Sequence, residues 1–129
     1  MVKLGVLLRV AAVYMALVGV AFLAWPDAMM LGTLGAGASA ALLGMIRVFA
    51  STFLGIAVLN WIAARAPSSP ARDAIVLGNT VGFALAAILG CLAVVGGAPS
   101  TGVANVVVAL AFAVAFFLAG RASMAARAG

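Results

Sequence analysis

The chain has 129 residues, of which 68% are hydrophobic and 7% are charged, and its formal net charge is +5. Soluble domains carry about 25% charged residues, so this composition excludes an ordinary soluble domain and is typical of a membrane-spanning chain. The length suits one small bundle without a separate soluble domain. The positive charge forms no continuous basic face, so we expect no nucleic-acid binding.

Four apolar segments follow one another along the chain, separated by segments rich in Gly, Pro and Ser. Each is near the ~20 residues that cross a ~30 Å hydrocarbon core. Pro26 and Asp27 end the first, and Ser39, after a glycine-rich loop, is a candidate N-cap for the second. We predict an all-α integral membrane four-helix bundle, a single domain over residues 1–129. The predicted spans are residues 4–25, 40–64, 71–95 and 102–120, with a short basic tail at 121–129.

The basic residues predict the topology. Six of the seven fall in regions that four passes would place on one side of the membrane, and short cytoplasmic loops are enriched in Lys and Arg. Both termini are therefore expected to be cytoplasmic, with Trp25 and Trp61 near opposite interfaces. The six residues are Lys3, Arg9, Arg65, Arg72, Arg121 and Arg127.

A signal peptide is the alternative interpretation of residues 1–25, with Lys3 as its basic start and Ala36-Gly37-Ala38 as a cleavage site. The apolar run is longer than the 7–15 residues of a typical signal-peptide core, and the cleavage motif lies too far beyond it. We therefore favour a retained first span.

The seventh basic residue, Arg47, lies about 10 Å along the second span. A charge within a span is a candidate functional site. We predict an outer polar layer in which Arg47 meets Asp27, Ser51 and Asn105. Two interpretations stay open: Arg47 snorkels or joins the first two spans, or it binds an anionic headgroup, substrate or ion through its bidentate fork.

A second polar layer is predicted nearer the cytoplasm. Asn60 and Asn79 lie at similar depth on antiparallel neighbouring spans, and Arg9 and Tyr14 could join them. The layer would serve as interhelical hydrogen bonding or as a ligand or quinone-head site. Asp73 suits the N-terminal helix dipole at the start of its span.

Small residues predict helix packing. Gly78, Gly82, Ala86 and Gly90 recur every four residues in the third span, a ridge that lets another backbone approach closely. Its partner is either another helix of this chain or a second copy. Further small stripes suit a tight left-handed bundle. They are Gly5, Ala12 and Gly19; Gly44, Ser51 and Gly55; and Ala111, Ala115 and Ala119.

Missing residue types exclude several chemistries. The chain has no His, no Glu and one cysteine, Cys91, which we expect to be buried as a small hydrophobe. Haem ligation by His, histidine metal sites and iron–sulfur clusters are excluded, and no nucleophile–base pair is present. We predict no catalytic residue, no metal and no cofactor, and hence no enzyme.

Residues 47–82 carry a family resemblance. They combine Arg47, Gly55, Asn60-Trp61, Ala64-Arg65, Ala71-Arg72 and Gly78-Asn79 over two spans and a polar turn. This pattern resembles small bacterial four-helix membrane proteins of the DoxX-like kind. The resemblance implies a compact bundle in the bacterial inner membrane, and it carries no catalytic residue to this chain.

The favoured function is a non-enzymatic accessory or structural membrane component that packs with itself or with a larger complex. One alternative is a small oligomeric channel or transporter with an anion or lipid-headgroup site at Arg47. A third is a quinone- or lipid-associated subunit that uses Asn60 and Asn79. Any partner must be met within the bilayer, because the short loops leave no room for a soluble recognition domain.

Overall fold

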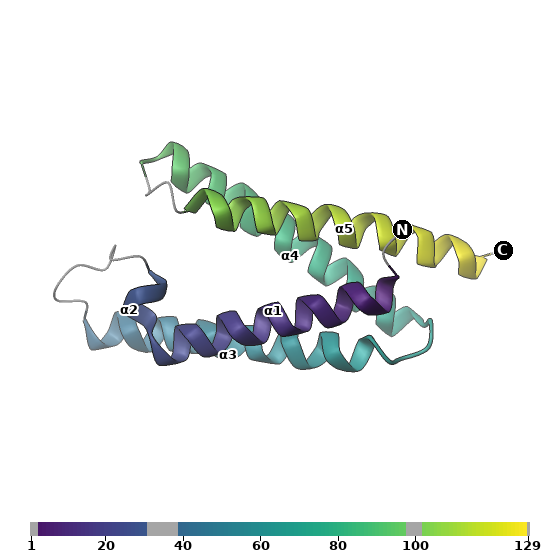
Figure 1. The fold of residues 1–129 in the computed structure, drawn as a ribbon, viewed down its shortest axis with the longest axis horizontal. Coiled ribbons are helices and arrows are strands. Elements are labelled where there is room, and N and C mark those ends of the chain that lie inside the picture. Colours follow the sequence, from purple (N-terminus) through teal and green to yellow (C-terminus); the bar gives the residue numbers. More distant parts are fainter. Residues whose placement is uncertain (1–2, 31–38, 98–101, 129) are drawn as a thin grey trace. The chain divides into compact units, whose positions relative to one another are not determined.

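The computed structural model describes residues 3–30, 39–97 and 102–128, and none of these residues lies in a strand. Four helices are long and apolar enough to cross a membrane, which confirms an all-α chain with four candidate spans. Most of the predicted glycine-rich loop lies outside the described residues. The helices, labelled in Figure 1, are α1 (Leu4–Ala24), α2 (Pro26–Met29), α3 (Ala40–Ala63), α4 (Pro70–Val95) and α5 (Gly102–Ala128).

Serine and proline set the helix starts. The Ser39 hydroxyl accepts a hydrogen bond from the Leu42 amide at 3.2 Å, which confirms Ser39 as the N-cap of α3. Ser69 caps α4 in the same way, and Pro70 occupies the first helical position, where its missing N–H costs nothing. Pro26 ends α1 but also begins the four-residue α2, which the sequence analysis did not predict.

Helix α5 extends beyond the predicted fourth span. Helix α5 does not stop at Gly120 but continues to Ala128, so the predicted basic tail is helical. Residues 121–128 contain neither Gly nor Pro and are mostly Ala and Arg, which are strong helix formers. Gly120 is a site of close contact instead, because a Cβ there would lie 2.8 Å from Cγ1 of Val76.

The described chain divides into two compact units. The first, residues 8–62, is called the α1–α3 unit here, and the second, residues 1–7 with 63–129, is the α4–α5 unit. Figure 1 shows α1 beside α3 and α4 beside α5. The first turn of α1 belongs to the second unit, so α1 contributes to both.

In the α1–α3 unit the two helices run antiparallel. A Cβ on Gly19 would lie 2.9 Å from Leu54 and 3.1 Å from the Ala50 carbonyl oxygen. Three residues on, Phe22 stacks on Phe53 with ring centroids 6.1 Å apart. The inward residues recur at alternating steps of three and four, the spacing of left-handed helix pairs. They are Leu8, Ala12, Met15, Gly19 and Phe22 on α1, and Ile46, Ala50, Phe53, Ala57 and Asn60 on α3.

Helices α4 and α5 form a second antiparallel pair with the same kind of seam. Phe83 of α4 stacks on Phe112 and Phe116 of α5, at centroid distances of 4.7 and 6.1 Å. The closest backbone approach is at Gly90, where a Cβ would lie 2.6 Å from Cγ2 of Val106. The seam residues are Val76, Asn79, Phe83, Ala87, Gly90 and Val94 on α4, and Gly102, Val106, Ala109, Ala113, Phe116 and Gly120 on α5.

The small-residue stripes have different outcomes. Gly5, Ala12 and Gly19 lie on the inward side of α1, as predicted: Ala12 and Gly19 are buried, and Gly5 approaches the Ala64 carbonyl. The other two predicted stripes lie off the seams. Ser51 and Gly55 are exposed on α3, and Ala111 is exposed on α5.

We expect Gly90→Ala to destabilise the α4–α5 pair by about 1–2 kcal/mol. The added methyl meets a short, β-branched side chain that cannot move aside, and this strain outweighs the gain in helix propensity. Gly82→Ala is the matched control, because nothing lies within 4 Å of its Cβ position. Unfolding in mixed micelles of increasing SDS content, followed by circular dichroism, measures both. Equal effects would contradict the close approach at Gly90.

Candidate functional site

The predicted outer layer is not joined by contacts in the structure. Arg47 and Asp27 are both exposed in the α1–α3 unit, and among the described residues neither forms an ion pair. Ser51 uses its hydroxyl locally, donating to the Val48 carbonyl at 2.7 Å. Asn105 is exposed on α5, in the other unit. The layer therefore stays a prediction.

Arg47 lies on an exposed small-residue face of α3. Gly44, Ser51 and Gly55 recur with it at steps of three and four; Ser51 and Gly55 are exposed and Gly44 is half-buried. Arg47 itself lies about 60° around the helix from the seam residue Ala50. Nothing lies within 4 Å of a Cβ on either glycine. Arg47 lies about 10 Å along the axis from the start of α3.

Asn60 and Asn79 are the buried polar residues of the described chain, with 0% and 6% exposure. Asn60 lies on the α3 stripe that faces α1, and Asn79 lies on the α4 stripe that faces α5. The Asn79 amide also donates to the Ile75 carbonyl of its own helix at 2.9 Å. Each asparagine thus belongs to the seam of its own helix pair, where a polar residue can fix the register.

The other members of the predicted second layer are less buried. Arg9 is exposed and Tyr14 is half-buried, both on α1 in the same unit as Asn60. Asn79 lies in the other unit, so the joint layer stays a prediction. Thr80, beside Asn79, bonds to the Val76 carbonyl at 2.9 Å.

The predicted ridge on α4 divides into a packed and an open part. Gly90 contacts α5, as described above. Gly78, Gly82 and Ala86 are exposed, and no atom lies within 4 Å of a Cβ on either of these two glycines. The open part of the ridge therefore presents bare backbone and is not used in the α4–α5 seam.

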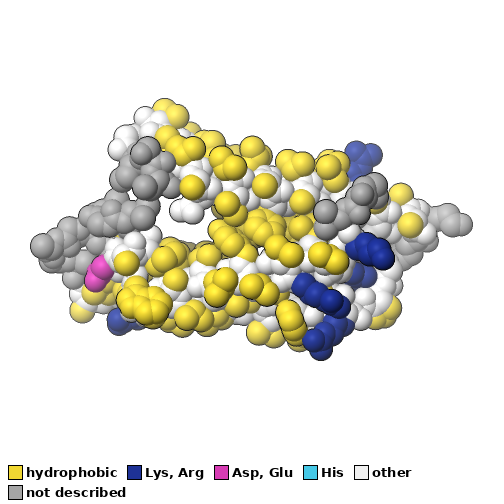
Figure 2. Space-filling model, in the orientation of Figure 1, with side chains coloured by type: hydrophobic (Ala, Val, Ile, Leu, Met, Phe, Trp, Pro, Cys, Tyr) yellow, Lys and Arg dark blue, Asp and Glu magenta, His cyan; other side chains and the backbone are white. Residues whose placement is uncertain are grey.

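Basic side chains gather at one end of the α4–α5 unit. A Cβ on Gly5 would lie 3.1 Å from the Ala64 carbonyl oxygen and 3.7 Å from Nη2 of Arg72, so the first turn of α1 meets the start of α4. Figure 2 shows dark-blue side chains around this point. Because Gly120 meets Val76, Arg121 of α5 lies at the same end. Which side of the membrane this end faces stays a prediction.

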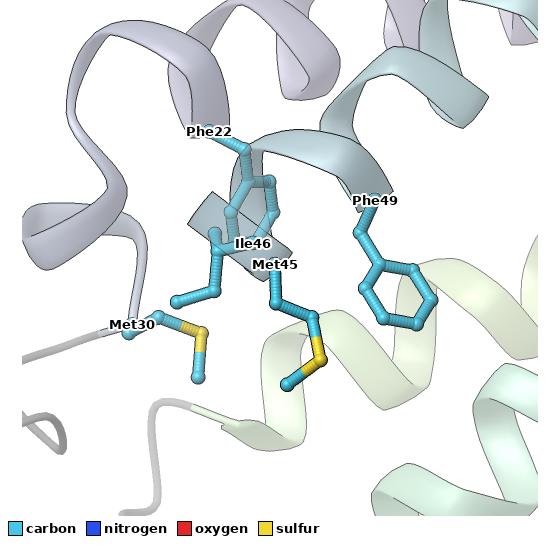
Figure 3. Close-up of a pocket in the computed structure, with 5 residues that line it drawn as sticks. All are labelled: Phe22, Met30, Met45, Ile46 and Phe49. Atoms are coloured by element: carbon cyan, nitrogen blue, oxygen red, sulfur yellow. The ribbon is translucent and has the colours of Figure 1, made fainter. Parts of the chain in front are cut away.

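A cavity of about 290 Å³ lies in the α1–α3 unit, and the sequence analysis missed it. Figure 3 shows side chains from α1, from the residue after α2 and from α3 around it. The lining residues are Phe22, Met30, Met45, Ile46 and Phe49. A site needs a few polar groups to orient a polar substrate, and this lining supplies none, so the cavity suits only an apolar group.

The described chain holds few side chains that could bind a metal ion or act as a thiol. Within residues 3–30, 39–97 and 102–128, no group of three or more His, Cys, Asp or Glu side chains lies close enough to hold a metal ion. The expectation that Cys91 is buried was wrong, because its side chain is exposed. The α4 seam passes through Ala87, Gly90 and Val94, which leaves position 91 beside it.

No protein-family model, curated protein or solved structure matches this chain. The site is therefore defined by geometry alone. The basic end, the open α4 ridge and the Arg47 face are the surfaces with distinctive chemistry.

We expect Asn60→Ala to lower the free energy of unfolding by about 1–2 kcal/mol, because it removes a fully buried polar side chain from a seam and leaves a void. Asn105→Ala is the matched control and should stay within about 0.5 kcal/mol, since Asn105 is exposed. SDS unfolding of the two variants makes the comparison. A cost at Asn105 as large as at Asn60 would contradict the seam assignment.

Proposed function

We propose that this multi-pass membrane protein is a non-enzymatic accessory component that receives a transmembrane helix of a partner on the open part of its α4 ridge. The supporting observation is that Gly78, Gly82 and Ala86 are exposed, with open space at both glycine Cβ positions. Within a bilayer, helices associate by close packing rather than by the hydrophobic effect, so bare backbone is the surface that another helix fits.

The contrast among the glycines strengthens this proposal. Gly19, Gly90 and Gly120 are each tightly filled by a neighbouring side chain within one unit. Glycine destabilises a helix by about 1 kcal/mol relative to alanine. For a glycine outside the seams, no close helix contact within its own unit offsets this destabilisation. Contact with a second copy or with another membrane subunit would offset it. We place the protein in the bacterial inner membrane, in line with its resemblance to DoxX-like proteins, with both termini cytoplasmic.

A second candidate function is an oligomeric anion or lipid-headgroup path at Arg47. It is favoured by the exposed face on which Arg47 lies with Ser51 between two open glycines. Four spans rarely enclose a pore alone, so this function needs several copies. The third candidate, a quinone- or lipid-associated subunit, would use Asn60 and Asn79, which are buried within seams.

The partner surface can be tested with Gly82→Leu. A leucine would fill the open backbone groove, so we expect loss of the oligomer or of the co-purified partner, with helicity unchanged. Native mass spectrometry of protein extracted from its own membrane measures the assembly. Ala104→Leu, at an exposed α5 position, is the matched control. A wild-type monomer without partner, together with a destabilised Gly82→Leu variant, would instead place the ridge contact within the chain.

For the Arg47 path we expect Arg47→Ala to leave the unfolding free energy within about 0.5 kcal/mol, because the side chain is exposed and outside the seam. Anion flux into proteoliposomes should fall to the background of empty vesicles. Arg121→Ala, which removes the same charge elsewhere, should retain flux. If the wild-type protein gives no flux above empty vesicles, this second function is wrong.

A further inference from the structure

Several segments converge at the basic end of the α4–α5 unit. The missing side chain of Gly5 lets the first turn of α1 approach both the Ala64 carbonyl and the Arg72 guanidinium. Val76, one turn after Arg72, packs closely on Gly120 of α5. The start of α1, the end of α3, the start of α4 and the late turns of α5 therefore surround one place, with Arg72 within it.

Positive charge dominates this place. The sequence holds two acidic residues in all, and only Asp73 belongs to this unit. Against this one acidic residue the sequence of the unit holds five basic residues, of which Lys3, Arg65, Arg72 and Arg121 have described side chains and Arg127 is the fifth. The start of α4 adds the positive end of a 26-residue helix.

Three of these cations, Lys3, Arg72 and Arg121, form no ion pair within the described chain. Nε of Arg72 is buried and has no hydrogen-bond partner among the described residues. Lys3 is exposed, and within the same residues it forms no ion pair. The Arg121 guanidinium lies over the Phe117 ring at 5.6 Å, and no hydrogen bond joins it to another described residue. A buried guanidinium N–H without a partner is costly, so the geometry calls for an anion from outside the chain.

We propose that this end binds the phosphate of an anionic phospholipid, with Arg72 as its central contact and Lys3 and Arg121 beside it. Three of the candidate spans begin or end here, at Leu4, Ala63 and Pro70, so we expect these groups at the depth of the headgroups. The planar fork of arginine matches phosphate oxygens in a bidentate manner. Basic pockets between transmembrane helices are known to hold anionic headgroups. This site is separate from the α4 ridge and does not depend on the proposed accessory function.

The test is native mass spectrometry of the full chain from nanodiscs that contain equimolar phosphatidylglycerol and phosphatidylcholine with matched acyl chains. We expect phosphatidylglycerol to be retained at least about tenfold over phosphatidylcholine. Each cation near a membrane surface is worth about fivefold in binding, so Arg72→Gln should lower phosphatidylglycerol retention about fivefold or more.

The matched control is Arg9→Gln, which removes the same charge from an exposed position of the α1–α3 unit. We expect it to leave phosphatidylglycerol retention unchanged. Equal losses in both variants would mean a response to net charge alone and would overturn the site. Retention equal to the wild type in Arg72→Gln would overturn it as well.

Two further measurements keep the outcome decisive. If Arg72→Gln does not fold, Lys3→Gln replaces it, because Lys3 is exposed and its loss does not affect the fold. Unchanged retention in Lys3→Gln would then contradict the proposal. The third measurement adds inorganic phosphate to wild-type protein in phosphatidylcholine nanodiscs. Phosphate adducts as abundant as the phosphatidylglycerol adducts would identify a free-anion site and overturn the lipid assignment.

Discussion

Close approach of helix backbones at glycine is the contact on which both helix pairs depend. Lipid tails are as apolar as leucine, so burial of leucine or valine between two spans gains little in a bilayer. Dispersion contacts remain, and they fall off steeply with distance. Gly19 brings α1 against the Ala50 carbonyl, and Gly90 brings α4 against Val106. The stacked rings of Phe22 and Phe53, and those of Phe83 and Phe112, then fill other parts of the two seams.

The buried asparagines add specificity to this packing. Interhelical hydrogen bonds in membranes average only about 0.6 kcal/mol, so the cost expected for Asn60→Ala comes more from the void it leaves than from the lost hydrogen bond. A helix pair packed through small and apolar residues has few features that prevent sliding by one turn. A polar side chain in the seam restricts it, because a shifted register would move the amide into contact with lipid. Both asparagines lie on seams, which places them where this restriction acts.

The sequence predicts where the helices lie along the chain, but it does not predict which side of each helix faces a neighbouring helix. Hydropathy together with Ser39, Ser69 and Pro70 located the helices to within a residue or two, because caps and proline act locally. The helical extension of α5 beyond the predicted span and the close contact at Gly120 were not predicted, because the contact partner of Gly120, Val76, lies 44 positions earlier in the sequence. The direction in which Ser51 or Gly78 points was not predictable. In a soluble helix polar residues mark the outer side, but a span that meets lipid is apolar on every side.

The same distinction applies to the charges. Hydropathy and the positive-inside pattern predicted that Lys3, Arg72 and Arg121 share a side, and the contacts of Gly5 and Gly120 bring these regions to one end of the α4–α5 unit. Arg47 differs from them. A cation at the centre of a span costs about 2.5–3.5 kcal/mol, and its position near the start of α3 lowers that cost through snorkelling. Within the described chain no carboxylate pairs with Arg47 to offset the remaining cost of its charge. Water, a headgroup or a partner must therefore solvate Arg47, so its environment is set by what surrounds the protein rather than by its own packing.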